Sequence, residues 1–187
     1  MSGHNDYFAY LQSRSRLGLW YRRHWLYPRM CRYLCGRVLD VGCGIGDLLR
    51  FRPGTVGVDI NPATVAWCRE GGLDARVMVP DHLPFADADF DGVVLDNVLE
   101  HLESPRPLLT EIHRVLRPEG VLIAGVPGRR GYARDPDHKI FYDEDVLVEV
   151  MASARMQCEQ VLHMPLRSAW LDRYMPQYCV YGVFRRG

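Results

Sequence analysis

The chain has 187 residues, of which 48% are hydrophobic and 25% charged; this is ordinary for a globular protein, and the length favours one domain over two. The 23 lysines and arginines balance the 23 aspartates and glutamates, so no net charge draws the chain toward nucleic acid or a membrane surface. This balance argues against nucleic acid as a partner.

No apolar run approaches the roughly 20 residues that span a bilayer, and the N-terminal residues lack the apolar segment of a signal peptide. Six cysteines occur without a C-x-x-C pair, so we expect reduced thiols rather than disulfides. These features predict a cytoplasmic protein without a membrane span.

Residues 1–35 are rich in aromatic and arginine side chains, among them Tyr7, Phe8 and Tyr10, and predict one or two helices with a break near Pro28. Short apolar runs follow, whose β-branched residues are typical of buried parallel strands: 37–41, 55–59, 75–79, 92–96 and 121–126. Helices are predicted between them over 46–51, 62–70 and 105–116.

This alternation of strands and helices predicts an α/β fold with a doubly wound, mostly parallel, Rossmann-like sheet. Residues 158–164 and 178–185 predict two further strands that pair as a C-terminal antiparallel hairpin at one edge. In such a sheet, ligands bind at the carboxyl ends of the strands, where the strand order reverses. We therefore expect the segments that follow the strands to surround one crevice.

The segment VLDVGCGIG, at residues 38–46, places glycines at every second position directly after the first strand. A phosphate-binding loop would need a lysine and a Ser or Thr after its glycines, but the chain continues Asp47-Leu48-Leu49. A dinucleotide fingerprint needs G-x-G-x-x-G, and Asp47 stands where its last glycine would fall and would repel a pyrophosphate. The dinucleotide interpretation is weakened but stays open.

S-adenosylmethionine contains an adenosine but no phosphate, and it suits these residues better. Glycines permit close backbone approach to its amino-acid end, and the carboxylates of Asp40 and Asp47 favour its ammonium and sulfonium cations. Asp59 ends the second strand, in VGVDINP, where it can accept hydrogen bonds from a ribose diol. Such an acid fits NAD equally well, so only the glycine spacing distinguishes S-adenosylmethionine from NAD here.

Four segments resemble, in order, the motifs of class I S-adenosylmethionine-dependent methyltransferases: VLDVGCGIG, VGVDINP, LPFADADFDGVVLDNVLEHL and LRPEGVLIAGVP. The resemblance runs from about residue 37 to residue 127 and implies S-adenosylmethionine as the cofactor. With it, the single domain of residues 1–187 divides into an N-terminal helical lid (1–35), a cofactor-binding core (36–127) and an acceptor-side region of loop, helix and edge strands (128–187).

By this resemblance, the loop glycines lie under the methionine part of the cofactor and Asp40 supports the loop. Asp59 accepts hydrogen bonds from the ribose hydroxyls, Ile60 packs on the adenine and Asn97 lies near the methyl group. The cofactor-binding residues so implied are Asp40, Gly42, Gly44, Gly46, Asp59, Ile60 and Asn97.

One position departs from the family pattern. An acidic residue that commonly binds the adenine amino group is replaced here by Val79, in VMVPDHLPF. Either Asp81, His82 or backbone groups make this contact instead, or the cofactor binds more weakly than is usual in the family.

Methyl transfer to a hydroxyl requires removal of a proton, and histidine titrates near the operating pH. His101 and His138, which follow the fourth and fifth strands, are the candidate bases. The family often has Glu-His at this point, so the alternative is that Glu100 and His101 orient the loop. A metal group of Asp96, Asn97, Glu100 and His101 is disfavoured because asparagine is a poor ligand there, and no metal is expected.

Basic residues between 129 and 139 are expected to overhang the acceptor pocket: Arg129, Arg130, Arg134, His138 and Lys139. Such residues indicate an acceptor that carries phosphate or carboxylate. The segment after this loop resembles the acceptor side of bacterial methyltransferases that act on small molecules, glycans or quinone precursors.

We therefore expect O-methylation of a small molecule or of a sugar or polysaccharide precursor, by a monomer or homodimer. Two alternatives stay open. One is an RNA methyltransferase, which the interleaved arginine and aromatic residues near the N-terminus favour. The other is a catalytically inactive methyltransferase fold that serves as an interaction module.

Overall fold

The computed structural model describes residues 16–187; Tyr7, Phe8 and Tyr10 of the expected N-terminal helices lie outside the described residues. A seven-stranded sheet within this range has the order β3-β2-β1-β4-β5-β7-β6. Its strands are β1 (Val38–Val41), β2 (Val56–Asp59), β3 (Ala75–Val77), β4 (Phe90–Asp96), β5 (Leu116–Pro127), β6 (Met156–Met164) and β7 (Cys179–Arg186).

The strand directions confirm the predicted doubly wound sheet. Strands β1 to β5 are parallel to their neighbours among themselves, and β7 is antiparallel to both β5 and β6. The C-terminal pair is more than a tight hairpin, because residues 165–178, which contain a helix, connect its two strands. Strand β7 lies between β5 and β6, so that β6 alone forms this edge.

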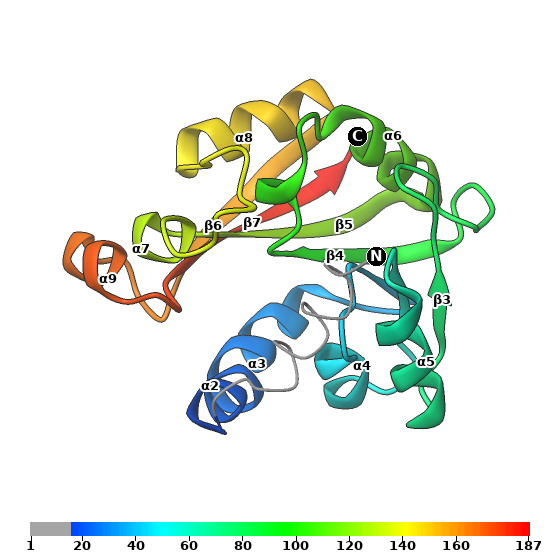
Figure 1. Ribbon diagram of the computed structural model, residues 1–187. Coiled ribbons are helices and arrows are strands. Elements are labelled where there is room, and N and C mark those ends of the chain that lie inside the picture. Colours follow the sequence, from blue (N-terminus) through cyan, green and yellow to red (C-terminus); the bar gives the residue numbers. More distant parts are fainter. Residues whose placement is uncertain (1–15) are drawn as a thin grey trace.

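Helices cover both faces of the sheet (Figure 1). One face carries α2 (Arg16–Tyr21), η1 (Arg22–Leu26), α3 (Tyr27–Met30), η2 (Cys31–Tyr33), α4 (Asp47–Phe51) and α5 (Pro62–Glu70). The opposite face carries α6 (Arg106–Val115) and α8 (Glu144–Ser153). Three short helices lie in connecting segments: η3 (Leu99–His101), α7 (Arg129–Tyr132) and α9 (Ala169–Tyr174).

Alternating side chains of the central strands divide the core between these two layers. Val38 of β1 belongs to the same buried cluster as Leu26 and Met30 of the N-terminal helices. Its neighbour Leu39 belongs instead to the cluster that contains Ile112 of α6. Successive strand residues point to opposite faces, so a strand covered on both sides must be apolar throughout, as the continuous apolar runs indicated.

Several predicted boundaries are displaced, and tertiary pairing explains two of them. The helix predicted to end at residue 116 ends at Val115, and Leu116 begins β5 by pairing with Phe90 of β4. The third strand ends at Val77 rather than at Val79, which forms an isolated bridge with His82. Tertiary pairing therefore determines both ends.

All six cysteines are free thiols. No helix within residues 16–187 combines the length and the hydropathy that a membrane-spanning helix needs.

The amphipathic character of α6 can be tested with Ile112→Ala, because Ile112 is fully buried against the sheet. We expect the free energy of unfolding to fall by about 2–5 kcal/mol, since the substitution removes buried methyl groups and leaves a cavity. Urea denaturation followed by circular dichroism measures the change. The exposed Thr110 on the same helix provides the control, and Thr110→Ala should change stability by less than about 0.5 kcal/mol. Equal losses in both variants would contradict the assigned orientation of α6.

Candidate active site

A cavity of about 400 Å³ opens at the carboxyl ends of β1, β2 and β4. It lies where the strand order reverses between β1 and β4, the position at which open α/β sheets bind ligands. Residues from the glycine loop, from the ends of β2 and β4, and from the loops after β3 and α7 line it. The segments expected to surround one crevice therefore meet at this cavity.

The glycine loop depends on left-handed backbone conformations. Gly42 has a φ of 76° and Gly44 a φ of 52°, values that side-chain-bearing residues rarely adopt. A Cβ atom on Gly42 would lie 2.5 Å from a methyl group of Val98, so this position has no room for a side chain. Gly42 and Gly44 both line the cavity with backbone.

Asp59 ties this loop to the second strand. Its buried carboxylate accepts hydrogen bonds from the backbone N–H groups of Gly44 and Asn61, each at 2.8 Å. Asn61 in turn caps α5, where its side chain accepts a hydrogen bond from the backbone N–H of Ala63. An ionised carboxylate can accept about four hydrogen bonds, so Asp59 can also accept from a diol in the cavity that it lines.

The cavity wall is strongly acidic. Its lining includes the aspartates Asp40, Asp47, Asp59, Asp81, Asp96, Asp135 and Asp137. The only arginine or lysine in this lining, which is drawn from residues 16–187, is Arg22. Burial raises the pKa of Asp40 well above its usual range, the Asp96 and Asp59 carboxylates raise it further, and Arg22 opposes them. A cation in this cavity would therefore be strongly favoured.

Residues 39–124 match the family model described as "Methyltransferase domain". A "probable S-adenosylmethionine-dependent methyltransferase" of Mycolicibacterium smegmatis is 34% identical over 157 residues, which make up 76% of this chain and 61% of that protein. The human "probable tRNA methyltransferase 9B" is 30% identical over 152 residues, or 76% of this chain and 30% of that protein.

The solved structure of a "SAM-dependent methyltransferase, possible histamine N-methyltransferase" from Thermotoga maritima covers 100% of both chains with a TM-score of 0.76 and 17% identity. Residues 39–124 therefore carry the sequence of the methyltransferase-domain family, and the chain has the fold of the class I S-adenosylmethionine-dependent methyltransferases. It spans 61% and 30% of the lengths of the two curated relatives.

The residues of this cavity fit the family's cofactor, S-adenosylmethionine. Glycine backbone at Gly42 and Gly44 leaves space for its amino-acid end, and the carboxylates of Asp40 and Asp47 complement its two cationic groups. Asp59 is positioned to hold the ribose diol, because its carboxylate lines the cavity at the end of β2.

The other predicted cofactor residues divide into two groups. Ile60, Asp81 and Asn97 line the cavity, and the Ile60 side chain is half exposed there. Gly46 and His82 do not line it. A Cβ atom on Gly46 would lie 2.6 Å from Leu73, so a glycine at this position lets α4 begin close to Leu73.

His82 instead faces solvent. Its side chain is 64% exposed, and its Nδ1 atom lies 3.3 Å from a carboxylate oxygen of Glu111. Of the two substitutes expected for the acid missing at Val79, only Asp81 reaches the cavity.

The basic loop turns its acids, not its bases, toward the cavity. Asp135 and Asp137 line the wall, whereas none of the basic residues between 129 and 139 does. Arg129 is held elsewhere, with its backbone N–H and its guanidinium both directed at Asp172 of α9. The expectation that this loop presents a basic surface to the acceptor is therefore wrong.

A partly buried network around Asp96 was not predicted from the sequence. Its carboxylate accepts hydrogen bonds from Arg22 at 2.9 Å, from the Tyr181 hydroxyl at 2.7 Å and from the Asn97 side chain at 2.8 Å. Gly125 of β5 leaves space for the Tyr181 ring, which would lie 2.2 Å from a Cβ atom at that position. Burial raises the pKa of Tyr181, so its hydroxyl stays protonated and donates. Nothing in the sequence distinguishes Arg22 from the other arginines near the N-terminus, so its contact with Asp96 could not be predicted.

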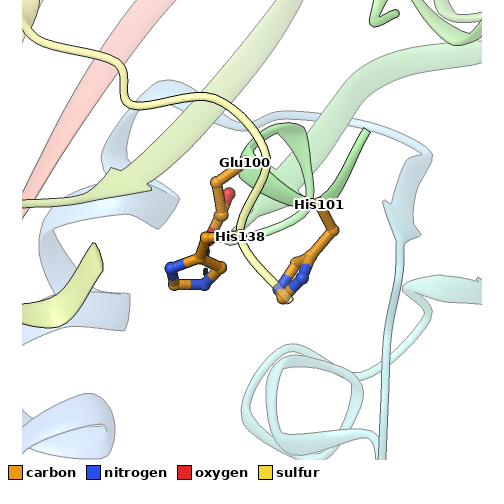
Figure 2. Close-up of side chains that lie close together, drawn as sticks. All are labelled: Glu100, His101 and His138. Carbon is orange, nitrogen blue, oxygen red and sulfur yellow. Dashed lines mark ion pairs between the residues drawn. The ribbon is translucent and has the colours of Figure 1, made fainter. Parts of the chain in front are cut away.

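The two candidate bases lie together beside Glu100 (Figure 2). The rings of His101 and His138 are 4.7 Å apart, and His101 lines the cavity while His138 lies behind it, 8% exposed. The Nδ1 atom of His138 donates a hydrogen bond of 2.9 Å to the carbonyl oxygen of Tyr132, so its Nε2 carries the lone pair in the neutral ring. Burial lowers the pKa of His101, and the His138 ring lowers it further.

Glu100 is 1% exposed, and neither of its carboxylate oxygens has a hydrogen-bond partner. Burial raises its pKa to about 8, and Asp96 and Asp135 add to the effect. The pair of histidines thus lies against a carboxyl group that holds its proton at neutral pH.

The variant Asp59→Ala tests the cofactor site. We expect S-adenosylhomocysteine to bind about 30- to 1,000-fold more weakly, a loss of about 2–4 kcal/mol, because the ribose hydroxyls lose their acceptor and the glycine loop loses its anchor. Isothermal titration calorimetry measures the affinity. The control is Asp74→Ala, which removes an exposed aspartate paired only with Arg76 and should leave the affinity unchanged. Equal affinities of Asp59→Ala and the wild type would remove Asp59 from the site.

The raised pKa of Glu100 predicts a pH dependence of stability. Between the ordinary pKa of 4.5 and about 8, the folded protein keeps a proton that the unfolded chain releases, so stability falls as the pH rises through this window. Glu100→Gln lacks this titration. Its free energy of unfolding should therefore gain on the wild type by up to about 1.4 kcal/mol per pH unit within that window. Urea denaturation at several pH values, with a chelator present, measures the difference; parallel curves for the two proteins would refute the shift.

Proposed function

We propose that this methyltransferase transfers the methyl group of S-adenosylmethionine to a hydroxyl oxygen of a small molecule or of a sugar or polysaccharide precursor. The observation that carries the proposal is the position of His101, a neutral imidazole on the wall of the cofactor cavity. A hydroxyl acceptor requires such a base, because the proton must leave as the oxygen attacks.

In this mechanism, the bound cofactor supplies an electrophilic methyl group, whose carbon–sulfur bond breaks as the carbon–oxygen bond forms. His101 accepts the proton of the acceptor hydroxyl. His138 is a positioning residue: its ring is fixed by the Tyr132 carbonyl and contacts His101 edge-on. Asp96 and Tyr181 hold the end of β4, and so keep the base at a constant distance from the glycine loop.

The acidic wall points to a neutral, hydroxyl-rich acceptor. Asp135 and Asp137 stand on the side of the cavity that comes from the loop after α7, where they can accept hydrogen bonds from hydroxyl groups. The single arginine of the wall, Arg22, is already paired with Asp96. An acceptor carrying phosphate or carboxylate would therefore meet repulsion, and this part of the earlier expectation is replaced.

The similarity to the human probable tRNA methyltransferase 9B favours RNA methylation instead. Against it stands the same acidic wall, because RNA binding needs positively charged surface along the path of the phosphates. A catalytically inactive interaction module would not need the cavity, the glycine loop or the histidine on the cavity wall. The cytoplasmic location and the monomeric or dimeric state belong to the same proposal; the free thiols agree with a reducing compartment.

The reaction can be tested by transfer of a tritiated methyl group to a panel of acceptors. The panel contains neutral sugars and phenols, sugar phosphates, polyamines and transfer RNA. We expect labelling of neutral hydroxyl compounds, and we expect His101→Gln to lower kcat by about 10²- to 10⁴-fold.

Affinity for S-adenosylhomocysteine should stay within about threefold in that variant, because the base lies at the acceptor. His24→Gln, at an exposed histidine outside the cavity, is the control for kcat. Labelling of polyamines or transfer RNA alone would overturn the O-methylation proposal.

A further inference from the structure

Glu100, His101 and His138 form a compact group of potential metal ligands (Figure 2). One carboxylate oxygen and one nitrogen from each histidine all lie within 4.8 Å of one another, which no other three such side chains in residues 16–187 match. Ligand atoms that bind one ion at about 2.0–2.2 Å are roughly 3–3.5 Å apart, so modest side-chain rotations bring these three to a common ion.

The carboxyl group of Glu100 is buried without a hydrogen-bond partner and lies next to both histidines. It is 1% exposed, and both of its oxygens lack a hydrogen-bond partner. The Nε2 atom of His138 lies 3.9 Å from one of these oxygens, and Figure 2 shows the two side chains next to each other. Burying a polar group without a hydrogen-bond partner is unfavourable, and a bound cation would remove that cost.

The surroundings of His138 match those of a metal ligand. Its Nδ1 atom donates to the Tyr132 carbonyl at 2.9 Å, and its ring stacks on Tyr132 with centroids 5.2 Å apart. Metal-binding histidines almost always donate their second ring N–H in this way, which fixes the ring and directs the other lone pair at the ion. Asp135 adds a carboxylate oxygen 3.9 Å from the Nε2 atom.

We propose that Glu100, His101 and His138 bind a divalent first-row transition ion at the edge of the cofactor cavity. A set of two imidazoles and one carboxylate suits such ions better than Mg²⁺ or Ca²⁺, which prefer oxygen ligands alone. The sequence disfavoured a metal group that contained Asn97, which is a poor ligand. The fold brings His138 to Glu100 and His101 instead.

Three protein ligands leave coordination positions open, and His101 places them at the cavity. There the ion would hold the acceptor oxygen and favour its ionised form, which would relieve His101 of its role as base. This role rests on the proposed function, whereas metal binding itself does not.

The test is a titration of the chelator-treated full chain with Co²⁺, followed by visible absorption and by calorimetry. We expect one site whose absorption bands report histidine ligands. Glu100→Gln and His138→Gln should each weaken binding by at least about 100-fold, since even partners one step removed from a metal contribute 10- to 100-fold. The control is His163→Gln, which removes the histidine of another His–Glu pair, 3.2 Å from Glu144, and should leave the affinity within about twofold.

Two results would overturn the proposal: no Co²⁺ binding by the wild type, or binding that both cluster variants retain. Urea denaturation checks that each variant folds, and His101→Gln provides a third variant should one of the others fail. Calorimetry with S-adenosylhomocysteine in the presence of chelator separates the two proposals. Loss of Co²⁺ binding with retained S-adenosylhomocysteine binding identifies the cluster as the metal site, whereas a wild type that binds S-adenosylhomocysteine but not Co²⁺ refutes the metal site alone.

Discussion

The contact of the Asp59 carboxylate with two backbone N–H groups supports the rest of the site. One oxygen holds Gly44 of the loop after β1, and the other holds Asn61 at the start of α5. Hydrogen bonds to a charged group contribute about 1.5–3 kcal/mol each, enough to offset much of the cost of burying the carboxylate. The same contact keeps the loop in left-handed conformations that leave its backbone open to the cavity.

The acidity of the cavity follows from this arrangement and creates a second constraint. Asp59 and Asp96 end β2 and β4, and Asp40 is next to the last residue of β1, which lies between these two strands; the three carboxylates are therefore close together and their charges repel. Arg22 of η1 pairs with one of them, Asp96, at 2.9 Å, and the Tyr181 hydroxyl adds a neutral donor. The remaining negative charges match the ammonium and sulfonium groups of S-adenosylmethionine, which carries a net positive charge.

Local sequence patterns predicted the sheet and the cofactor half of the site because both depend on short-range features. Apolar runs, glycine spacing and the acid at the end of β2 are each readable within a few residues. Gly46 and His82 were assigned to the cofactor from their place in a motif, although the fold turns them elsewhere. Contacts between distant segments could not be predicted. Arg22 meets Asp96, and His138 meets Glu100, only because the sheet brings their elements together.

The same distinction explains why the family reveals the cofactor and leaves the acceptor open. The family match ends at residue 124, before the loop that contributes Asp135 and Asp137 to the wall. That loop is anchored outside the matched range, since Gly128 bonds to the Tyr178 carbonyl and the Arg129 backbone to Asp172 of α9. Arg22 also lies outside it. The part of the cavity wall that the family model does not cover is therefore held in place by contacts particular to this chain, those of the loop after α7 with α9 and that of Arg22 with Asp96.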